Sequence, residues 1–132
     1  MPDIVVSEFM DEAAVADLQR DHDVHYNPGL VDRPEELMAL VGDCRALIVH
    51  NRTQVRGALL EACRRLVVVG RLGVGLDNID LAACRARKIE VCPATGANDD
   101  AVAEYVVGGV LLLLRSAFDA TAEVLAGAWP RT

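Results

Sequence analysis

The fold of this chain is decided by one stretch, Leu66-Val67-Val68-Val69-Gly70-Arg71-Leu72-Gly73-Val74-Gly75-Leu76-Asp77-Asn78-Ile79-Asp80. It opens with a short run of branched apolar residues, which is typical of a buried strand, and its glycines precede a segment with helical spacing. A strand, a glycine-rich turn and a helix in this order form the repeating unit of a parallel sheet with covering helices. We therefore expect an α/β protein on both sides of this stretch.

Similar units flank this stretch. Five apolar runs predict strands at Ile4–Ser7, Val24–Tyr26, Ala46–Val49, Leu66–Gly70 and Ile89–Cys92. Four segments predict helices at Glu12–Arg20, Pro34–Val41, Val55–Cys63 and Leu81–Arg87, with Asp11, Asp32 and Asp80 placed as caps. Right-handed crossovers favour a doubly wound, flavodoxin-like five-stranded parallel sheet, in the order 2-1-3-4-5, with helices on both faces. This order predicts a ligand crevice at Glu8, Phe9 and His50–Thr53.

A long apolar C-terminal helix is expected after Thr95-Gly96-Ala97. Asn98 is its predicted cap, and two aspartates follow in the first turn, where carboxylates favour the positive end of a helix. Large aliphatic side chains between Val106 and Leu114 cover more of the helix than one sheet face can bury. Because burying each contributes roughly 1.5 to 3 kcal/mol, we expect this helix to be covered on two sides.

Composition excludes several classes of partner and site. Thirteen Lys and Arg against twenty Asp and Glu leave a formal net charge of −7, which disfavours nucleic acid and acidic membrane surfaces. The cysteines form no pair with metal-ligand spacing, and we expect no metal site and a reduced, cytoplasmic chain. The N-terminus shows no secretory signal pattern, and the longest apolar run falls far short of the roughly 18 residues of a membrane span.

The glycine loop invites a dinucleotide-binding interpretation, but the details disagree with it. The third glycine of that fingerprint is replaced by Asn78, and Asp77 and Asp80 would bring carboxylates to where a pyrophosphate would bind. A cradle of backbone N–H groups at Gly73, Val74 and Gly75 suits a small carboxylate better. A tight turn with local caps remains the alternative on spacing alone.

Three motifs in order resemble those of a known family. The stretch from Gly70 to Asp80 resembles the G-R-x-G-x-G-x-D-N-I-D signature of the D-isomer-specific 2-hydroxyacid dehydrogenases, most closely of the phosphoglycerate dehydrogenase branch. Asn51-Arg52-Thr53 is similar to the segment that follows the third strand in that branch. The stretch from Ile89 to Asn98, followed by Ala101-Val102-Ala103-Glu104-Tyr105, resembles its V-x-N-x-P-x-x-N-x-x-x-V-A-E pattern. The resemblance covers the whole chain.

This resemblance implies an enzyme that moves hydride between NAD or NADP and a small 2-hydroxy or 2-keto acid. It implies that residues 1–98 bind substrate, with Arg52 and the backbone of Val74 and Gly75 meeting the acidic groups. From the residues alone, Arg71 or Arg52 could supply a bidentate partner for a carboxylate in the cradle at Gly73, Val74 and Gly75. Residues 99–132 would form a crossing helix and the start of a linker, with Asn98 and Val102 near the cofactor and a homodimer formed through Asp100–Arg115. The cofactor would be bound mainly by a domain absent from this chain. The family's catalytic residues lie in that domain, so we expect the 132 residues alone to be inactive.

Two other classes of protein share this topology. A phosphorylation receiver needs paired acids after the first strand, an Asp after the third and a Lys after the fifth, but this chain has Ser7-Glu8, His50-Asn51 and Cys92-Pro93 there. A flavin carrier needs a phosphate loop rich in hydroxyl groups and glycine after the first strand, which is lacking. The serious alternative is a stand-alone, non-enzymatic module for ligand binding or oligomerisation, derived from the dehydrogenase family.

Overall fold

The computed structural model describes residues 1–115 and 118–129. The chain divides into two compact units, Met1–Ala97 and Asn98–Thr132, and each is described here by itself. The parts of the predicted 99–132 segment at 116–117 and 130–132 lie outside the described residues.

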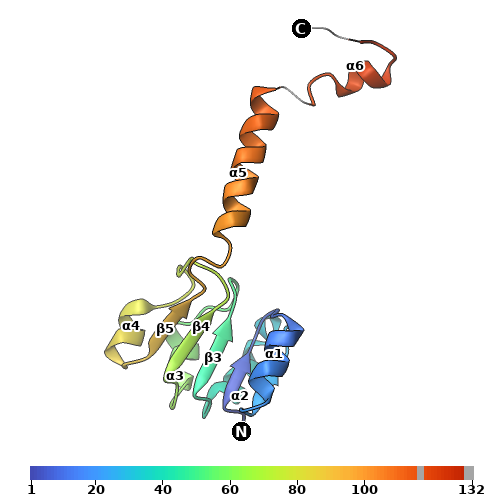
Figure 1. Ribbon diagram of the computed structural model, residues 1–132. Helices are drawn as coiled ribbons and strands as arrows, with labels where there is room; N and C mark the ends of the chain where they lie inside the picture. Colours follow the sequence, from blue (N-terminus) through green and yellow to red (C-terminus); the bar gives the residue numbers. More distant parts are fainter. Residues whose placement is uncertain (116–117, 130–132) are drawn as a thin grey trace. The chain divides into compact units, whose positions relative to one another are not determined.

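Five parallel strands form the sheet of the first unit (Figure 1). They are β1 (Ile4–Val6), β2 (Val24–Tyr26), β3 (Ala46–Val49), β4 (Val68–Arg71) and β5 (Glu90–Pro93). Their order is β2-β1-β3-β4-β5, which confirms the predicted order. Because the chain changes direction across the sheet between β1 and β3, the loops after these two strands diverge and leave room for a ligand between them.

The helices of the first unit confirm the predicted alternation. They are α1 (Glu12–Gln19), the 3-10 turn η1 (Leu30–Asp32), α2 (Pro34–Val41), α3 (Gly57–Ala62) and α4 (Leu81–Ala86). The Asp11 carboxylate caps α1 by accepting from the N–H groups of Ala13 and Ala14, and the Asp80 carboxylate caps α4 by accepting from Ala83 N–H.

Some predicted boundaries and one predicted cap were wrong. The third helix does not begin at Val55, because Val55 N–H donates to Asn78 and Val55 C=O accepts from Asp80 in a short parallel bridge. The fourth strand begins at Val68 rather than Leu66, and the fifth begins and ends one residue later than expected. Asp32 does not cap α2, whose N-cap residue is Arg33, and the Arg33 side chain makes no capping hydrogen bond.

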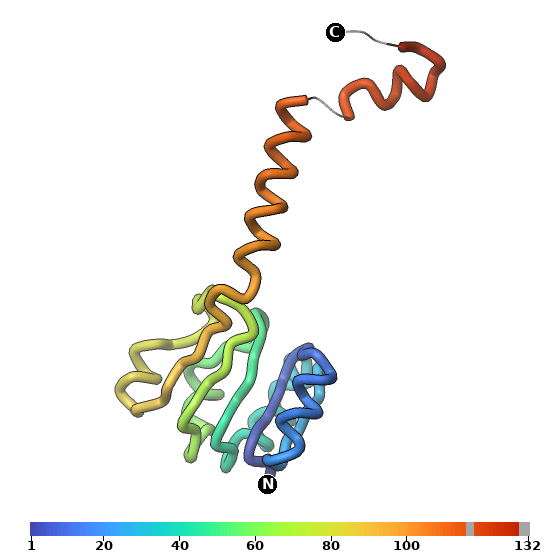
Figure 2. Tube along the Cα trace, viewed as in Figure 1, coloured from blue at the N-terminus to red at the C-terminus, as the bar shows by residue number. Residues whose placement is uncertain are grey.

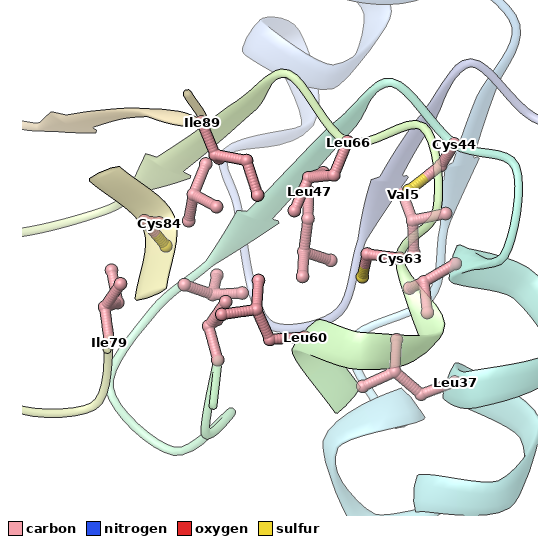
Figure 3. Packing of buried hydrophobic residues seen from close by; sticks show 14 of the residues in the cluster. Val5, Leu37, Cys44, Leu47, Leu60, Cys63, Leu66, Ile79, Cys84 and Ile89 are labelled. Atoms are coloured by element: carbon pink, nitrogen blue, oxygen red, sulfur yellow. The ribbon is translucent and has the colours of Figure 1, made fainter. Parts of the chain in front are cut away.

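The core lies on one face of the sheet (Figure 3). Because side chains alternate along a strand, Val5, Leu47 and Val69 point to the same side. They pack against Leu37 of α2 and Leu60 of α3, together with other buried residues of the loops and of α4. Val15 of α1 is also buried but lies outside this cluster, as do Ile4 and Val6. Helices therefore cover both faces.

Three of the four cysteines, Cys44, Cys63 and Cys84, belong to this core. Burial raises the pKa of Cys44 to about 12 and that of Cys63 to about 11. Both side chains are therefore neutral thiols that pack as small apolar groups. Within the described residues no group of His, Cys, Asp and Glu could hold a metal ion.

The second unit contains α5 (Asp99–Leu114) and α6 (Thr121–Leu125). α5 begins after Asn98, as predicted, with Asp99 and Asp100 in its first turn, although the Asn98 side chain makes no capping hydrogen bond. None of its residues is buried in this structure. Among the described residues, no helix has the length and apolar character needed to cross a membrane.

Candidate functional site

A cavity of about 340 Å³ opens where the sheet changes direction. Its walls come from the loops after β1, β2 and β3, with Glu8 and Phe9 on one side and His50, Asn51 and Arg52 on the other. The trace in Figure 2 shows that these loops and the glycine loop after β4 leave the same edge of the sheet. The crevice predicted at Glu8, Phe9 and His50–Thr53 is therefore present, except that Thr53 is buried and does not line it.

Glu8 lies at the base of this cavity and is only 5% exposed. Its carboxylate accepts hydrogen bonds from the backbone N–H groups of His50 (3.0 Å), Arg52 (3.1 Å) and Thr53 (2.9 Å). Burial by itself raises the pKa of a carboxyl group, but here the hydrogen bonds, led by Thr53, outweigh it and leave the pKa of Glu8 below its ordinary value. Glu8 is thus an anion at neutral pH.

Asn78 also contacts the loop after β3, through its carbonyl groups. It is 1% exposed, and its side-chain amide donates to the carbonyl oxygens of His50 (3.1 Å) and Thr53 (2.8 Å). The Thr53 hydroxyl also shares a hydrogen bond of 3.0 Å with the hydroxyl of Ser7. Since Asn78 belongs to the segment after the glycine loop, it ties the loop after β3 to the loop after β4.

The guanidinium group of Arg52 stands at the exposed edge of the cavity and forms an ion pair with Asp32. It donates from Nη1 to Asp32 Oδ2 at 3.3 Å and from Nη2 to the other carboxylate oxygen. The hydrogen bonding and the charge of Asp32 raise the pKa of Arg52. Because both side chains are more than half exposed, this pair contributes little to stability, and another carboxylate could replace Asp32.

The glycine loop presents main-chain rather than side-chain groups. Gly73 has a φ of +148°, and a Cβ atom there would lie 1.5 Å from Arg71 Nη1. Arg71 is half-buried, folds over this loop and donates from Nη1 to Leu72 C=O at 3.1 Å. The Gly73 N–H, which the sequence predicts to belong to the cradle, instead donates to Arg71 C=O at 2.8 Å. Across the described part of the chain, no protein acceptor takes the N–H of Val74 or of Gly75. Both residues are exposed, so these N–H groups are free to meet an anion.

The glycine loop does not fit a nucleotide pyrophosphate. The N-terminus of α4, where the pyrophosphate would bind, already carries the Asp80 carboxylate, which accepts from Ala83 N–H. This observation agrees with the sequence-based interpretation that this loop is not a dinucleotide site.

The remaining predicted site residues lie in the second unit. Asn98 precedes α5 and is exposed, and Val102 lies in the first turns of α5 and is 51% exposed. The structure therefore brings together Arg52, Glu8 and the loop after β3, and it connects that loop to Gly73–Gly75 through Asn78.

Sequence reasoning missed the roles of Glu8, Asp32 and Asn78. Glu8 was placed at the crevice but given no task, although an acidic residue directly after a buried strand at this edge was a usable signal. Asp32 was interpreted as a helix cap, and its pairing with Arg52 joins residues that are 20 positions apart. The sequence predicts Asn78 as a mismatch to the dinucleotide fingerprint or as a local cap of a tight turn, with no contact to the loop after β3.

Comparison with known families agrees with this geometry. The family model described as D-isomer specific 2-hydroxyacid dehydrogenase, catalytic domain, matches residues 4–126. Over 131 residues, or 99% of this chain, the sequence is 55% identical to an (S)-sulfolactate dehydrogenase of Chromohalobacter salexigens. The match covers 42% of that protein, so this chain spans less than half the length of that relative.

Solved structures show the same fold. A protein from Pyrococcus horikoshii superposes with a TM-score of 0.78 at 31% identity, over 99% of this chain and 39% of that one. An NAD+-bound 3-phosphoglycerate dehydrogenase of Entamoeba histolytica superposes with a TM-score of 0.64 at 27% identity, over 83% of this chain and 38% of that one. The family match over nearly the whole chain confirms the resemblance seen in the sequence motifs. The chain belongs to the D-isomer specific 2-hydroxyacid dehydrogenase family, within its catalytic domain.

Proposed function

We propose that this chain is the substrate-binding part of an oxidoreductase that transfers hydride between NAD or NADP and a small 2-hydroxy or 2-keto acid. The proposal rests on two groups that can bind anions, one on each of two loops that Asn78 connects. One is the guanidinium group of Arg52 at the cavity edge, and the other is the pair of free N–H groups at Val74 and Gly75.

The substrate we propose is an acid with a second anionic group. One anion would pair with Arg52, which presents a planar fork of donors that matches a carboxylate, sulfonate or phosphate. The substrate carboxylate would be bound by the N–H groups of Val74 and Gly75, because the Gly73 N–H already donates to Arg71 C=O. Arg71 packs over this cradle and is proposed to support it or to contact the acid directly. The sulfolactate and phosphoglycerate named for the two relatives both fit this description.

The second unit is proposed to connect the substrate-binding residues 1–98 to a nucleotide-binding domain outside this chain. In that arrangement Asn98 and Val102 would face the cofactor. The helix Asp100–Arg115 would cross to the other domain and pair with a second copy in a homodimer. The exposed apolar side chains of α5, among them Leu111 and Leu113, support a helix that is covered in a larger assembly.

Hydride transfer requires the cofactor-binding part, so the 132 residues alone are proposed to bind the acid without turning it over. A chimera tests this directly. The matching 42% of the C. salexigens (S)-sulfolactate dehydrogenase is replaced by this chain, and oxidation of (S)-sulfolactate and 3-phosphoglycerate is followed by NADH or NADPH absorbance.

We expect turnover by the chimera and none by the chain alone, with the unmodified relative as the positive control. A folded chimera that binds the nucleotide but oxidises neither acid would contradict the proposal and favour a stand-alone binding module. Turnover by the 132-residue chain alone would contradict the proposal that hydride transfer requires a separate cofactor-binding part.

A further inference from the structure

A buried carboxylate occupies the centre of the loop that carries Arg52. The N–H groups of His50, Arg52 and Thr53 all point at Glu8, at distances of 2.9 to 3.1 Å. Neighbouring N–H groups that converge in this way form an anion-binding concavity. In this chain the anion is supplied internally, so the main chain of this loop has no N–H left at these three positions for a substrate.

The carbonyl side of the same loop is also fixed. The side-chain amide of Asn78 donates hydrogen bonds to the C=O groups of His50 and Thr53. The Thr53 hydroxyl shares a hydrogen bond with the Ser7 hydroxyl. The backbone on both sides of Arg52 is thus held by buried polar side chains, while the guanidinium group itself stays exposed. A fixed backbone with an exposed charged end is the arrangement expected of a pre-organised binding residue.

We propose that Glu8 is a positioning residue, which fills the concavity formed by the N–H groups of His50, Arg52 and Thr53, so that the substrate's second anionic group is bound by the Arg52 side chain and not by these three main-chain groups. This inference rests on the proposed function, because it assigns a task within the same site.

The chemistry of Glu8 explains why a carboxylate is used here. Ionised Glu accepts through two oxygens with about four lone-pair positions, which is enough for three N–H donors. A Gln of the same size offers one oxygen, and its NH2 group would face N–H donors. The negative charge next to an anion-binding site is unfavourable in itself. The three hydrogen bonds that the Glu8 carboxylate accepts account for the presence of this charge.

The test uses the 132-residue chain labelled with 15N. The variants are Glu8→Gln, Glu8→Ala with and without added formate, and Glu12→Gln as the matched control at an exposed glutamate in the first turn of α1. Affinities for (S)-sulfolactate, which is dianionic, and for lactate, which is monoanionic, are measured by titration. Hydrogen exchange is measured at the amides of His50, Arg52 and Thr53.

Glu8→Gln should weaken sulfolactate binding about tenfold, which corresponds to about 1.4 kcal/mol, and lactate binding by less. It should also speed exchange of the three loop amides. Formate should restore sulfolactate binding to Glu8→Ala by filling the vacated concavity, which a merely structural loss would not allow. Glu12→Gln should match the wild-type chain in both measurements.

Unchanged sulfolactate affinity in a folded Glu8→Gln chain would overturn the inference, and so would a Glu8→Ala chain that formate does not rescue. If the wild-type chain binds neither acid, the proposed function fails. Glu8 is then judged on amide exchange: faster exchange in Glu8→Gln supports its hold on the loop, and unchanged exchange overturns it.

Discussion

The two loops proposed to meet the substrate are built in opposite ways. In the loop after β3 the backbone N–H groups of His50, Arg52 and Thr53 are taken by Glu8, and the charged group left for a ligand is the side chain of Arg52. In the loop at Gly73–Gly75 two of the three residues have no side chain, and the groups left for a ligand are the N–H groups of Val74 and Gly75. One loop therefore offers a side chain and the other offers its main chain.

This difference shows what each loop needs from its neighbours. A charged side chain can only be aimed if its backbone is held, which explains the buried polar groups of Glu8 and Asn78 around the first loop. A main-chain site needs close access to the backbone instead, which explains a glycine with positive φ in the second. The four predictions below would break or sharpen this contrast.

Removal of the Arg52 side chain should have the largest effect. Arg52→Ala is expected to weaken binding of a dianionic hydroxy acid about 100-fold, because it deletes a charge-assisted, bidentate partner. Binding of a monoanionic acid should change much less. Titration of the 132-residue chain measures both, with Arg64→Ala as the control, since Arg64 forms a comparable surface pair with Asp43. Equal losses for the two acids would remove Arg52 from the site.

A methyl group at Gly73 should damage the main-chain loop. Gly73→Ala combines a φ of +148° with a Cβ atom only 1.5 Å from Arg71, and we expect it to lower the free energy of unfolding by about 1–3 kcal/mol. Gly57→Ala is the matched control, because Gly57 also has positive φ but open space around its Cβ position. Urea unfolding compares the two. A Gly73 variant no less stable than the Gly57 variant would show that Arg71 moves freely away from the loop.

Acid should loosen the side-chain loop before the main-chain loop. The pKa of Glu8 is lower in the folded chain than its ordinary value near 4.3, so the charged form stabilises the fold. This contribution is complete above the ordinary pKa and is lost as the pH falls through the lowered folded pKa. Amide exchange at His50 and Thr53 should therefore accelerate as the pH falls below the ordinary pKa of a glutamate, and Glu8→Gln should abolish that pH dependence.

Neutralising Asp32 should have the smallest effect. Asp32→Asn removes the carboxylate that pairs with Arg52, and we expect about twofold to threefold tighter binding of a dianionic acid. The change is small because the pair is exposed and screened. Asp43→Asn, which frees Arg64 instead, is the control for net charge. Weaker binding in Asp32→Asn would instead make Asp32 a support for Arg52.

More of the fold than of the candidate site could be predicted from the sequence. Strand order, helix alternation and the crevice position follow from apolar spacing and crossover handedness, which are local signals with few solutions. The contacts of Glu8 with residues 42 to 45 positions away could not be predicted, because hydrogen bonds between loops depend on how the sheet brings them together. The same holds for Asp32, whose spacing before Pro34 suits a cap as well as an ion pair.

The function of the glycine loop could be predicted only in part from its sequence. Its motif disfavours a dinucleotide site, and the structure agrees by placing the Asp80 carboxylate at the N-terminus of α4, where a pyrophosphate would lie. Spacing could not decide between an N–H cradle and a tight turn. The free N–H groups of Val74 and Gly75 favour the cradle, which is why it carries part of the proposed function.

The most direct test of the two-loop account is a titration of the 15N-labelled chain with (S)-sulfolactate, followed at every amide and at the Arg52 guanidinium. The account predicts the largest shifts at the amides of Val74 and Gly75 and at Arg52 Nε. The amides of His50 and Thr53, which already donate to Glu8, should move little. Shifts at His50 and Thr53 that exceed those at Val74 and Gly75 would contradict it.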